Sequence, residues 1–166
     1  MPLEITSAEA LWFLPFVLPI CLWVAFSDLS TMKIRNKAVL ALAAVFLVIG
    51  LIALPLPEYP WRVATMVVVL LIGIVANAAG LMGAGDAKFI AAASPFIDPR
   101  DLVILCVIFT ANLLAAFAAH RIAKYTPLRN LAPGWESWSR GRKFPMGFSL
   151  GSTLAIYLIL GATHGS

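Results

Sequence analysis

Residues 102–119 read LVILCVIFTANLLAAFAA, a run without a single charged side chain. An α-helix rises about 1.5 Å per residue, so this run would form a helix of ~27 Å, close to the thickness of the hydrocarbon core of a bilayer. The whole chain has the same character, because 61% of its 166 residues are hydrophobic and 12% are charged, against about 25% charged in an ordinary soluble domain. These proportions exclude a soluble globular enzyme, a disordered chain and a nucleic-acid-binding domain. They predict an integral membrane protein that has the lipid bilayer as a partner.

Five further apolar segments surround this run. Only helices and closed barrels satisfy their backbone hydrogen bonds within lipid, and barrel-like alternation is absent. We therefore predict an all-α bundle of six transmembrane helices, in one membrane-embedded domain over residues 1–166. The first ten residues contain no Lys or Arg, so we expect a retained first span rather than a cleaved signal peptide. The expected spans are residues 11–26, 38–54, 61–81, 86–97, 102–119 and a last span from 144 or 146 to 160.

The fourth segment is the short one, since a helix of its length covers only ~18 Å. Charge indicates that it nevertheless crosses. With six crossings, ten basic residues lie on one side of the membrane and two on the other, and the positive-inside rule places the basic side in the cytoplasm. Both termini are then outside, and loops 27–37, 82–88 and 120–145 are cytoplasmic. The ten are Lys33, Arg35, Lys37, Lys88, Arg121, Lys124, Arg129, Arg140, Arg142 and Lys143, and the two are Arg62 and Arg100.

Ionisable side chains at membrane depth are costly, and they are functional candidates by default. Only two acids meet this criterion in the sequence, namely Asp28 in FSDL and Asp86 in GAGDAK. On the predicted topology, both lie at the cytoplasmic membrane boundary. Taken singly, Asp28 is equally explained as an interfacial charge beside Lys33 or Lys37, and Asp86 as a helix N-cap.

Taken together, two carboxylates at one depth predict a proton-sharing pair, because two such groups in close approach do not both ionise readily. The ionised member can take a proton from water, and the protonated member can polarise a peptide carbonyl. That chemistry is peptide hydrolysis without a covalent intermediate. Gly83 and Gly85 lack a Cβ, so they would allow unusual backbone angles and close approach of a substrate strand.

The motifs around these acids resemble those of a known family. Residues 83–86 (GAGD) form a GxGD motif, and Lys88 follows it. Asp28 is followed by residues 34–36 (IRN), with arginine where the family has proline in an Ile-Pro-Asn triplet. Residues 143–147 (KFPMG) are similar to the family's Pro-aromatic-Gly start of the last span. The chain thus resembles the GxGD membrane aspartic proteases, and in particular the prepilin leader peptidases.

The resemblance implies an aspartic endopeptidase of the inner membrane that removes the leader of type IV or Flp-type prepilins. It implies Asp28 and Asp86 as the catalytic pair, needing no metal or cofactor. Gly83, Gly85, Lys88 and Asn36 would shape the site or bind substrate. Larger members also methylate their product and carry a cysteine-bearing insertion, which is absent from this sequence. The chain is therefore similar to the minimal, CpaA/TadV-like peptidases of tight-adherence pili, with archaeal preflagellin peptidases as the nearest alternative. The oligomeric state stays open.

Other interpretations carry less weight. Residues 147–151 (GFSLG) match GxSxG, but that motif needs a strand-turn-helix setting, and small residues in an apolar helix favour close packing. His120 and His164 stand singly, without a metalloprotease motif. Trp135 and Trp138 are typical of an interfacial anchor, with substrate docking as the alternative. A non-enzymatic membrane protein, either a small transporter or an assembly scaffold, is the rival from another class.

Overall fold

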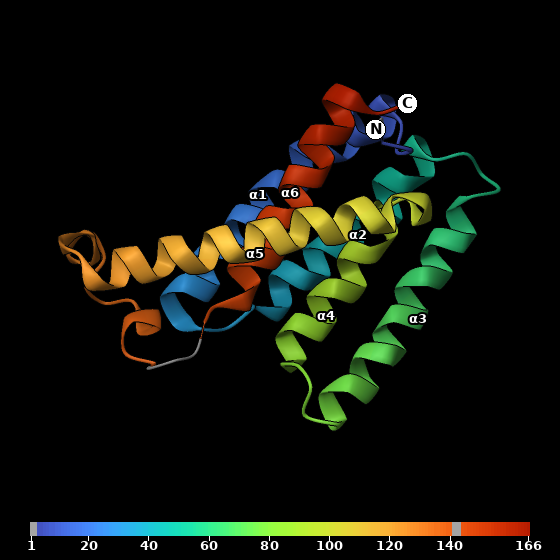
Figure 1. Cartoon of the computed structure of the whole chain (residues 1–166). Coiled ribbons are helices and arrows are strands. Elements are labelled where there is room, and N and C mark those ends of the chain that lie inside the picture. The colour runs from blue at the N-terminus through green and yellow to red at the C-terminus, as the bar shows by residue number, and fades with distance from the viewer. Residues whose placement is uncertain (1–2, 141–143) are drawn as a thin grey trace.

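The computed structural model describes residues 3–140 and 144–166, so Arg142 and Lys143 of the expected cytoplasmic loop lie outside the described residues. It confirms the all-helical bundle (Figure 1). Within the described residues, five helices are long and apolar enough to cross a membrane, and the fourth is shorter, as expected. The α-helices are α1 (Ser7–Thr31), α2 (Asn36–Ala53), α3 (Tyr59–Ala78), α4 (Ala84–Ala93), α5 (Leu102–Tyr125) and α6 (Met146–His164).

Helix α1 is longer than the apolar run that predicts it. It begins after Thr6, whose side chain accepts a hydrogen bond from the backbone N–H of Glu9, as an N-cap does. It ends at Met32, which adopts a left-handed conformation with φ 53°. The polar residues after Phe26 therefore still form a helical turn, and Asp28 lies inside that last turn rather than beyond the span.

The six segments connect two polar ends of the bundle. At the terminal end, Leu3 forms a bridge with Gly165, and the two chain termini lie together in Figure 1. At the loop end, the end of α1 meets the start of α6. The chain turns at the terminal end in residues 54–58 and 94–101. At the loop end it turns in residues 32–35 and 79–83 and in the described parts of the last loop, residues 126–140 and 144–145.

The fourth segment links the two ends although α4 is only 10 residues long, which corresponds to ~15 Å. It starts at the loop end beside α3, on which it mainly packs (Figure 1). The 3₁₀ turn η1 (Ser94–Phe96) and the residues that follow carry the chain onward to the terminal end. A short helix and a turn together thus carry the fourth segment from one end of the bundle to the other, while its crossing of the bilayer stays a prediction.

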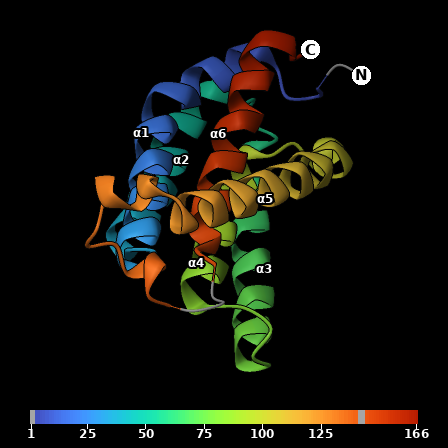
Figure 2. The same ribbon diagram turned by 60° about the vertical axis from the view of Figure 1, so that its left-hand side comes forward.

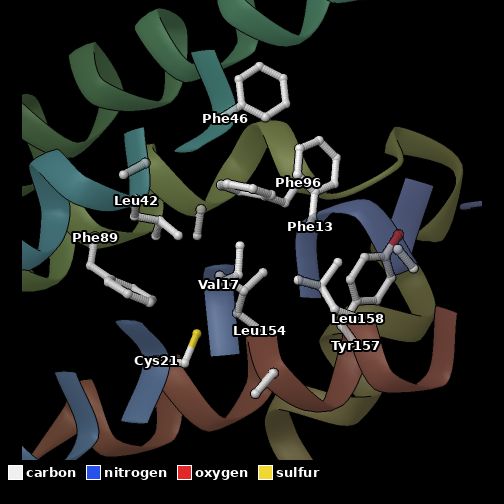
Figure 3. Close-up of a cluster of buried hydrophobic side chains, with 14 of the residues drawn as sticks. Phe13, Val17, Cys21, Leu42, Phe46, Phe89, Phe96, Leu154, Tyr157 and Leu158 are labelled. Carbon is white, nitrogen blue, oxygen red and sulfur yellow. The ribbon is translucent and has the colours of Figure 1, made fainter. Parts of the chain in front are cut away.

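The core lies between α1, α2, α6 and the fourth segment, as Figure 3 shows. Phe13, Phe46 and Phe96 meet there, with ring centroids 4.9 Å apart for Phe13 and Phe96 and 5.3 Å apart for Phe46 and Phe96, both edge-on. Edge-on aromatic pairs add stabilisation beyond the area that they bury. Helices α3 and α5 instead present long apolar faces outward, as lipid-facing helices do.

Small residues bring α1 and α6 into close contact. A Cβ on Gly151 would lie 2.9 Å from the carbonyl oxygen of Cys21, and a Cβ on Gly161 would lie 3.1 Å from the Cβ of Ala10. Ser149, the serine of the GxSxG match, is buried within α6. The packing interpretation of this motif is therefore confirmed, and the nucleophile-elbow setting is not formed.

Helix α5 runs across the other helices in both views (Figures 1 and 2). It packs mainly on α6, where the side-chain amide of Asn112 donates to the Ser149 carbonyl and to the hydroxyls of Ser152 and Thr153. Between apolar helices such side-chain hydrogen bonds favour association. Asn112 therefore fixes the contact between α5 and α6.

A buried charge cluster, which we call the Arg62 cluster, joins four segments at the terminal end. The guanidinium of Arg62 donates to Asp98 at 2.9 Å and to the carbonyl of Ile97. The hydroxyl of Tyr157 donates to Asp101 at 2.8 Å and accepts the backbone N–H of Asp98. The start of α3, the end of the fourth segment and α6 are thereby tied together.

The same cluster also holds the N-terminus, because Asp101 accepts the backbone N–H groups of Glu4 and Ile5. Asp98 is only 4% exposed and Asp101 only 3%. Acids other than Asp28 and Asp86 are therefore buried as well, and Glu9 of α1, which is 8% exposed, is another. Asp98 and Asp101 follow Pro95 closely in sequence, and the turn that it opens buries them against α3 and α6.

We predict that Asp98 makes the protein acid-labile. Burial alone would raise the pKa of Asp98, but hydrogen bonds from Arg100 and the positive charges of Arg62 and Arg100 lower it overall. A carboxylate with a lowered folded-state pKa stabilises the fold above its unfolded pKa of about 4, and this contribution is lost as pH falls through the folded pKa. The free energy of unfolding in detergent should therefore decrease as the pH falls from about 5 to about 2.

Asp98→Asn should lower the free energy of unfolding at neutral pH by about 3–5 kcal/mol, because Arg62 is left buried without its anion. The variant should also show a flatter pH dependence in the acid range. Thermal unfolding followed by circular dichroism measures both effects. Equal acid sensitivity of the two proteins would contradict the assignment.

Candidate active site

Asp28 lies in the last turn of α1 and points at the start of α6. Its side chain is 5% exposed, and its Oδ2 accepts the backbone N–H of Gly147 at 2.6 Å and that of Phe148 at 3.3 Å. These N–H groups belong to the first turn of α6 and have no partner within that helix. Asp28 therefore caps α6 from a residue 119 positions earlier in the chain.

Asp86 lies in the first turn of α4, three residues after the N-cap Gly83. Its carboxylate accepts a hydrogen bond from the backbone of Gly83. This is the reciprocal half of a capping box, and the helix dipole favours an anion there. Asp86 thus does belong to a helix start, although the N-cap position itself is taken by glycine.

The two carboxylates share one cavity of about 260 Å³ at the loop end. They are close enough for the charge of Asp86 to act on Asp28. The shared membrane depth of Asp28 and Asp86 predicted this pairing, and the structure brings both side chains to the same cavity. Among the described residues, the lining is Asp28, Met32, Lys33, Ile34, Gly83, Gly85, Asp86, Phe144 and Met146.

Ile34 is the residue around which this end packs. A Cβ on Gly85 would lie 3.3 Å from the Cβ of Ile34, and a Cβ on Gly147 would lie 2.8 Å from its side chain. Glycine at both positions therefore lets Ile34 fit between the starts of α4 and α6. The Cβ of a residue at 147 would also lie 3.0 Å from the carboxylate of Asp28.

The expected reason for the two glycines of the GAGD motif needs correction. Gly83 has an ordinary φ of −69° and Gly85 is helical, so neither uses an unusual backbone angle. Gly83 instead leaves room for the carboxylate of Asp86, which would lie 2.8 Å from a Cβ at that position. Gly85 leaves room for Ile34. Both glycines accommodate side chains of this chain, while approach of a substrate strand stays a prediction.

Asn36 and Lys88 contact each other rather than the carboxylates. The ammonium of Lys88 donates to the side-chain carbonyl of Asn36 at 3.3 Å, which joins the starts of α2 and α4. Neither residue lines the cavity described above. Lys88 was expected to shape the site or bind substrate, and this role stays a prediction. No ion pair of Lys88 occurs among the described residues.

The two tryptophans of the 126–140 segment pack against protein. Trp135 meets Phe26 of α1 edge-on at 5.9 Å and stacks on Trp138 at 5.5 Å. Trp138 stacks in turn on the buried His120 of α5. This stack holds the segment over the loop end, close to Phe144 of the cavity.

Ile34, Phe144 and Met146 form walls of the cavity, which their sequence did not predict. Their only signal was their place in the two short motifs at residues 34–36 and 143–147. In the part of the chain that the structure describes, no Ser, Thr, Cys or His lines the cavity. Its chemistry is therefore that of two carboxylates, which can activate a water molecule and protonate a carbonyl oxygen.

The comparison with known families agrees with the site. The model of the type IV leader peptidase family matches residues 15–120, a range that includes both carboxylates, the IRN triplet and the GAGD motif. Neither the curated proteins nor the solved structures include a match to this chain.

We predict that an uncharged side chain of the same shape at position 28 still stabilises the fold by capping α6. Asp28→Ala removes the acceptor of two N–H groups of α6 and should lower the free energy of unfolding by about 1–2 kcal/mol, as loss of a helix cap does. Asp28→Asn retains one acceptor oxygen in the same shape, so it should lose roughly half as much or less. Thermal unfolding in detergent compares the two variants. Equal destabilisation by the two variants would show that the cap depends on the charge of Asp28 and would contradict the prediction.

Proposed function

We infer the function from one premise, which is that the chain belongs to the type IV leader peptidase family. We propose that it is an aspartic endopeptidase that cleaves the leader from type IV or Flp-type prepilins. The substrate has a short basic leader followed by an apolar helix. Cleavage takes place at the cytoplasmic membrane boundary, where the leader leaves the bilayer.

The observation that carries this proposal is the shared cavity of Asp28 and Asp86. The two acids come from helices α1 and α4, and both lie within one turn of a helix end. A coupling-ion site of a transporter is expected nearer the bilayer midplane. Their place at the loop end therefore favours a peptidase acting at the membrane surface over the transporter alternative.

The proposed mechanism uses the two carboxylates in opposite protonation states. The ionised carboxylate takes a proton from a water molecule as the water oxygen bonds to the carbon of the scissile peptide. The protonated carboxylic acid gives its proton to the carbonyl oxygen. When the tetrahedral intermediate collapses, the C–N bond breaks, and the leaving nitrogen takes the proton that the first carboxylate removed from water. The second carboxylate takes back a proton from a hydroxyl of the intermediate, which restores the starting state of the pair. The products are a free leader carboxylate and a new amino terminus.

Two structural features support this division of labour. The N–H groups of Gly147 and Phe148 hold one oxygen of Asp28 and leave the other oxygen available. The carboxylate of Asp86 lies against the backbone of Gly83. Backbone groups beside each carboxylate help to keep the two acids oriented.

We also propose that this chain cleaves without methylating its product, as expected of the minimal, CpaA/TadV-like type. The new amino terminus should then carry no added methyl group when S-adenosylmethionine is present. Mass spectrometry of the cleaved pilin measures this directly. A methylated product made by this chain alone would contradict the proposal.

Both acids should be essential for cleavage. Asp28→Asn and Asp86→Asn retain side-chain shape but cannot exchange the proton, so each should reduce the cleavage rate by about 10²–10⁴-fold. The double variant should be no worse than either single variant, because the two acids act as a unit. Cleavage of a full-length prepilin by purified protein in proteoliposomes measures all three.

Glu136→Gln is the matched control, since Glu136 is an exposed acid at the same end whose ion pair with Arg140 is superficial. This variant should retain the wild-type rate. Substantial cleavage by a correctly folded Asp28→Asn or Asp86→Asn variant would exclude the aspartic mechanism.

The loop end should face the cytoplasm, as the distribution of basic residues predicts. With Cys106 replaced by Ser, a cysteine at Gly134 should react with a membrane-impermeant thiol reagent only after the inner face is opened. A cysteine at Glu58 should react from outside. Both positions are exposed. Labelling of position 134 in intact cells would overturn this orientation and with it the proposed place of cleavage.

A further inference from the structure

A second cavity of about 480 Å³ lies outside the active site, between α2, α3 and α4. We call it the α2–α4 groove. One helical face of each helix forms it, with residues spaced three or four positions apart. Its surface is almost entirely apolar, apart from Asn36 and Lys88. The lining residues are Asn36, Val39, Leu40, Ala43, Met66, Val67, Leu70, Lys88, Ala91 and Ala92.

The α2–α4 groove begins where the active-site cavity ends. Ile34, in the loop before α2, lines the cavity, and Asn36, the first residue of α2, lines the groove. Asp86, in the first turn of α4, lines the cavity, and Lys88, the residue after that turn, lines the groove. Residues two apart on a helix point in nearly opposite directions. The active-site cavity and the groove therefore lie on opposite sides of α4. A chain leaving the carboxylates would pass the start of α4 and the contact between Asn36 and Lys88 to reach the groove.

We propose that the α2–α4 groove binds the apolar helix of the substrate, in the part that directly follows the scissile bond. This inference rests on the proposed function and names the surface that recognises the substrate. From Asn36 to Ala43 the groove runs along eight residues of α2, which span ~10 Å. It therefore accommodates about two turns of the bound helix. Recognition of the apolar segment is concentrated in those two turns.

The walls of the groove suit a helix. Ala43, Ala91 and Ala92 have short side chains, and small residues allow the backbone of a neighbouring helix to approach closely within a membrane. Asn36 and Lys88 mark the end nearest the active site, where the bound chain must change from helix to an extended peptide. An acyl chain of lipid would also fit an apolar groove, but nothing in its chemistry requires the groove to start at the carboxylate pair.

Photo-crosslinking tests the location of the bound helix. A benzophenone amino acid is placed at Leu40 or Val67, which are 68% and 50% exposed, so the substitution leaves the core untouched. Matched controls carry it at Val103 or Val107 of α5, which are 79% and 63% exposed. All four proteins also carry Asp86→Asn, so that a full-length prepilin stays intact during illumination.

Crosslinks to the apolar helix of the prepilin should form from positions 40 and 67 and be absent, or several-fold weaker, from positions 103 and 107. Equal yields from all four positions, or crosslinks from α5 alone, would overturn the proposal. Crosslinks to lipid alone from positions 40 and 67 would also overturn it and identify the groove as a lipid site.

A kinetic measurement in the wild-type background gives a second test. Ala43→Phe fills the groove without approaching the carboxylates, so it should raise KM for full-length prepilin by about tenfold and leave kcat within about twofold of wild type. Ala111→Phe, an equal enlargement on the exposed face of α5, should change neither constant. An unchanged KM in a folded Ala43→Phe protein would contradict the groove while leaving the peptidase function standing. Failure of the wild-type protein to cleave any prepilin would instead reject the proposed function itself.

Discussion

The bond between the carboxylate of Asp28 and the first N–H groups of α6 determines how the loop end is built. It satisfies backbone donors that a buried helix start would otherwise leave unpaired, and it fixes the acid on which the proposed chemistry depends. Gly147 makes this contact possible because any Cβ there would press on both Asp28 and Ile34. Ile34 in turn sits against Gly85, which brings the first turn of α4 and its Asp86 to the same cavity. The same few atoms therefore hold the loop end together and position the two acids of the proposed mechanism.

The terminal end is the counterpart of this arrangement. The Arg62 cluster ties the end of the fourth segment to α3, α6 and the N-terminus through buried and mutually satisfied charges. Because α4 is too short to cross a bilayer as a helix, it needs a fixed attachment at both of its ends. The cluster provides one attachment, and the contacts around Ile34 and Asn36 provide the other. Between the two polar ends, the aromatic core around Phe96 holds the fourth segment against α1 and α2 (Figure 3).

Apolar runs predicted the helical bundle, and two acids at the membrane boundary predicted the residues that share the cavity. These features are local in sequence, and each follows from the cost of placing charge or an unpaired backbone in lipid. The contact of Arg62 with Asp98 and the fit of Ile34 between two glycines were missed, because partners that lie far apart in the chain leave no periodic signal. Asp98 and Asp101 look like ordinary loop acids until the turn after Pro95 is seen to bury them. The observed end of α1 differs from the predicted end of the first span for a related reason. Its polar last turn is stabilised by contact with α6 rather than by its own composition.

The proposed mechanism requires Asp28 and Asp86 to act on each other across one cavity. Carbon-13 NMR of side-chain carboxyl groups measures this interaction. The titration of each remaining acid, with Glu136 as the control, is followed in wild-type protein, Asp28→Asn and Asp86→Asn in detergent micelles. Two interacting carboxylates titrate as a pair. The account therefore predicts that replacing either residue shifts the titration midpoint of the other, whereas the midpoint of the exposed Glu136 stays unchanged. Titration of each aspartate at the same midpoint with and without its partner would contradict the account.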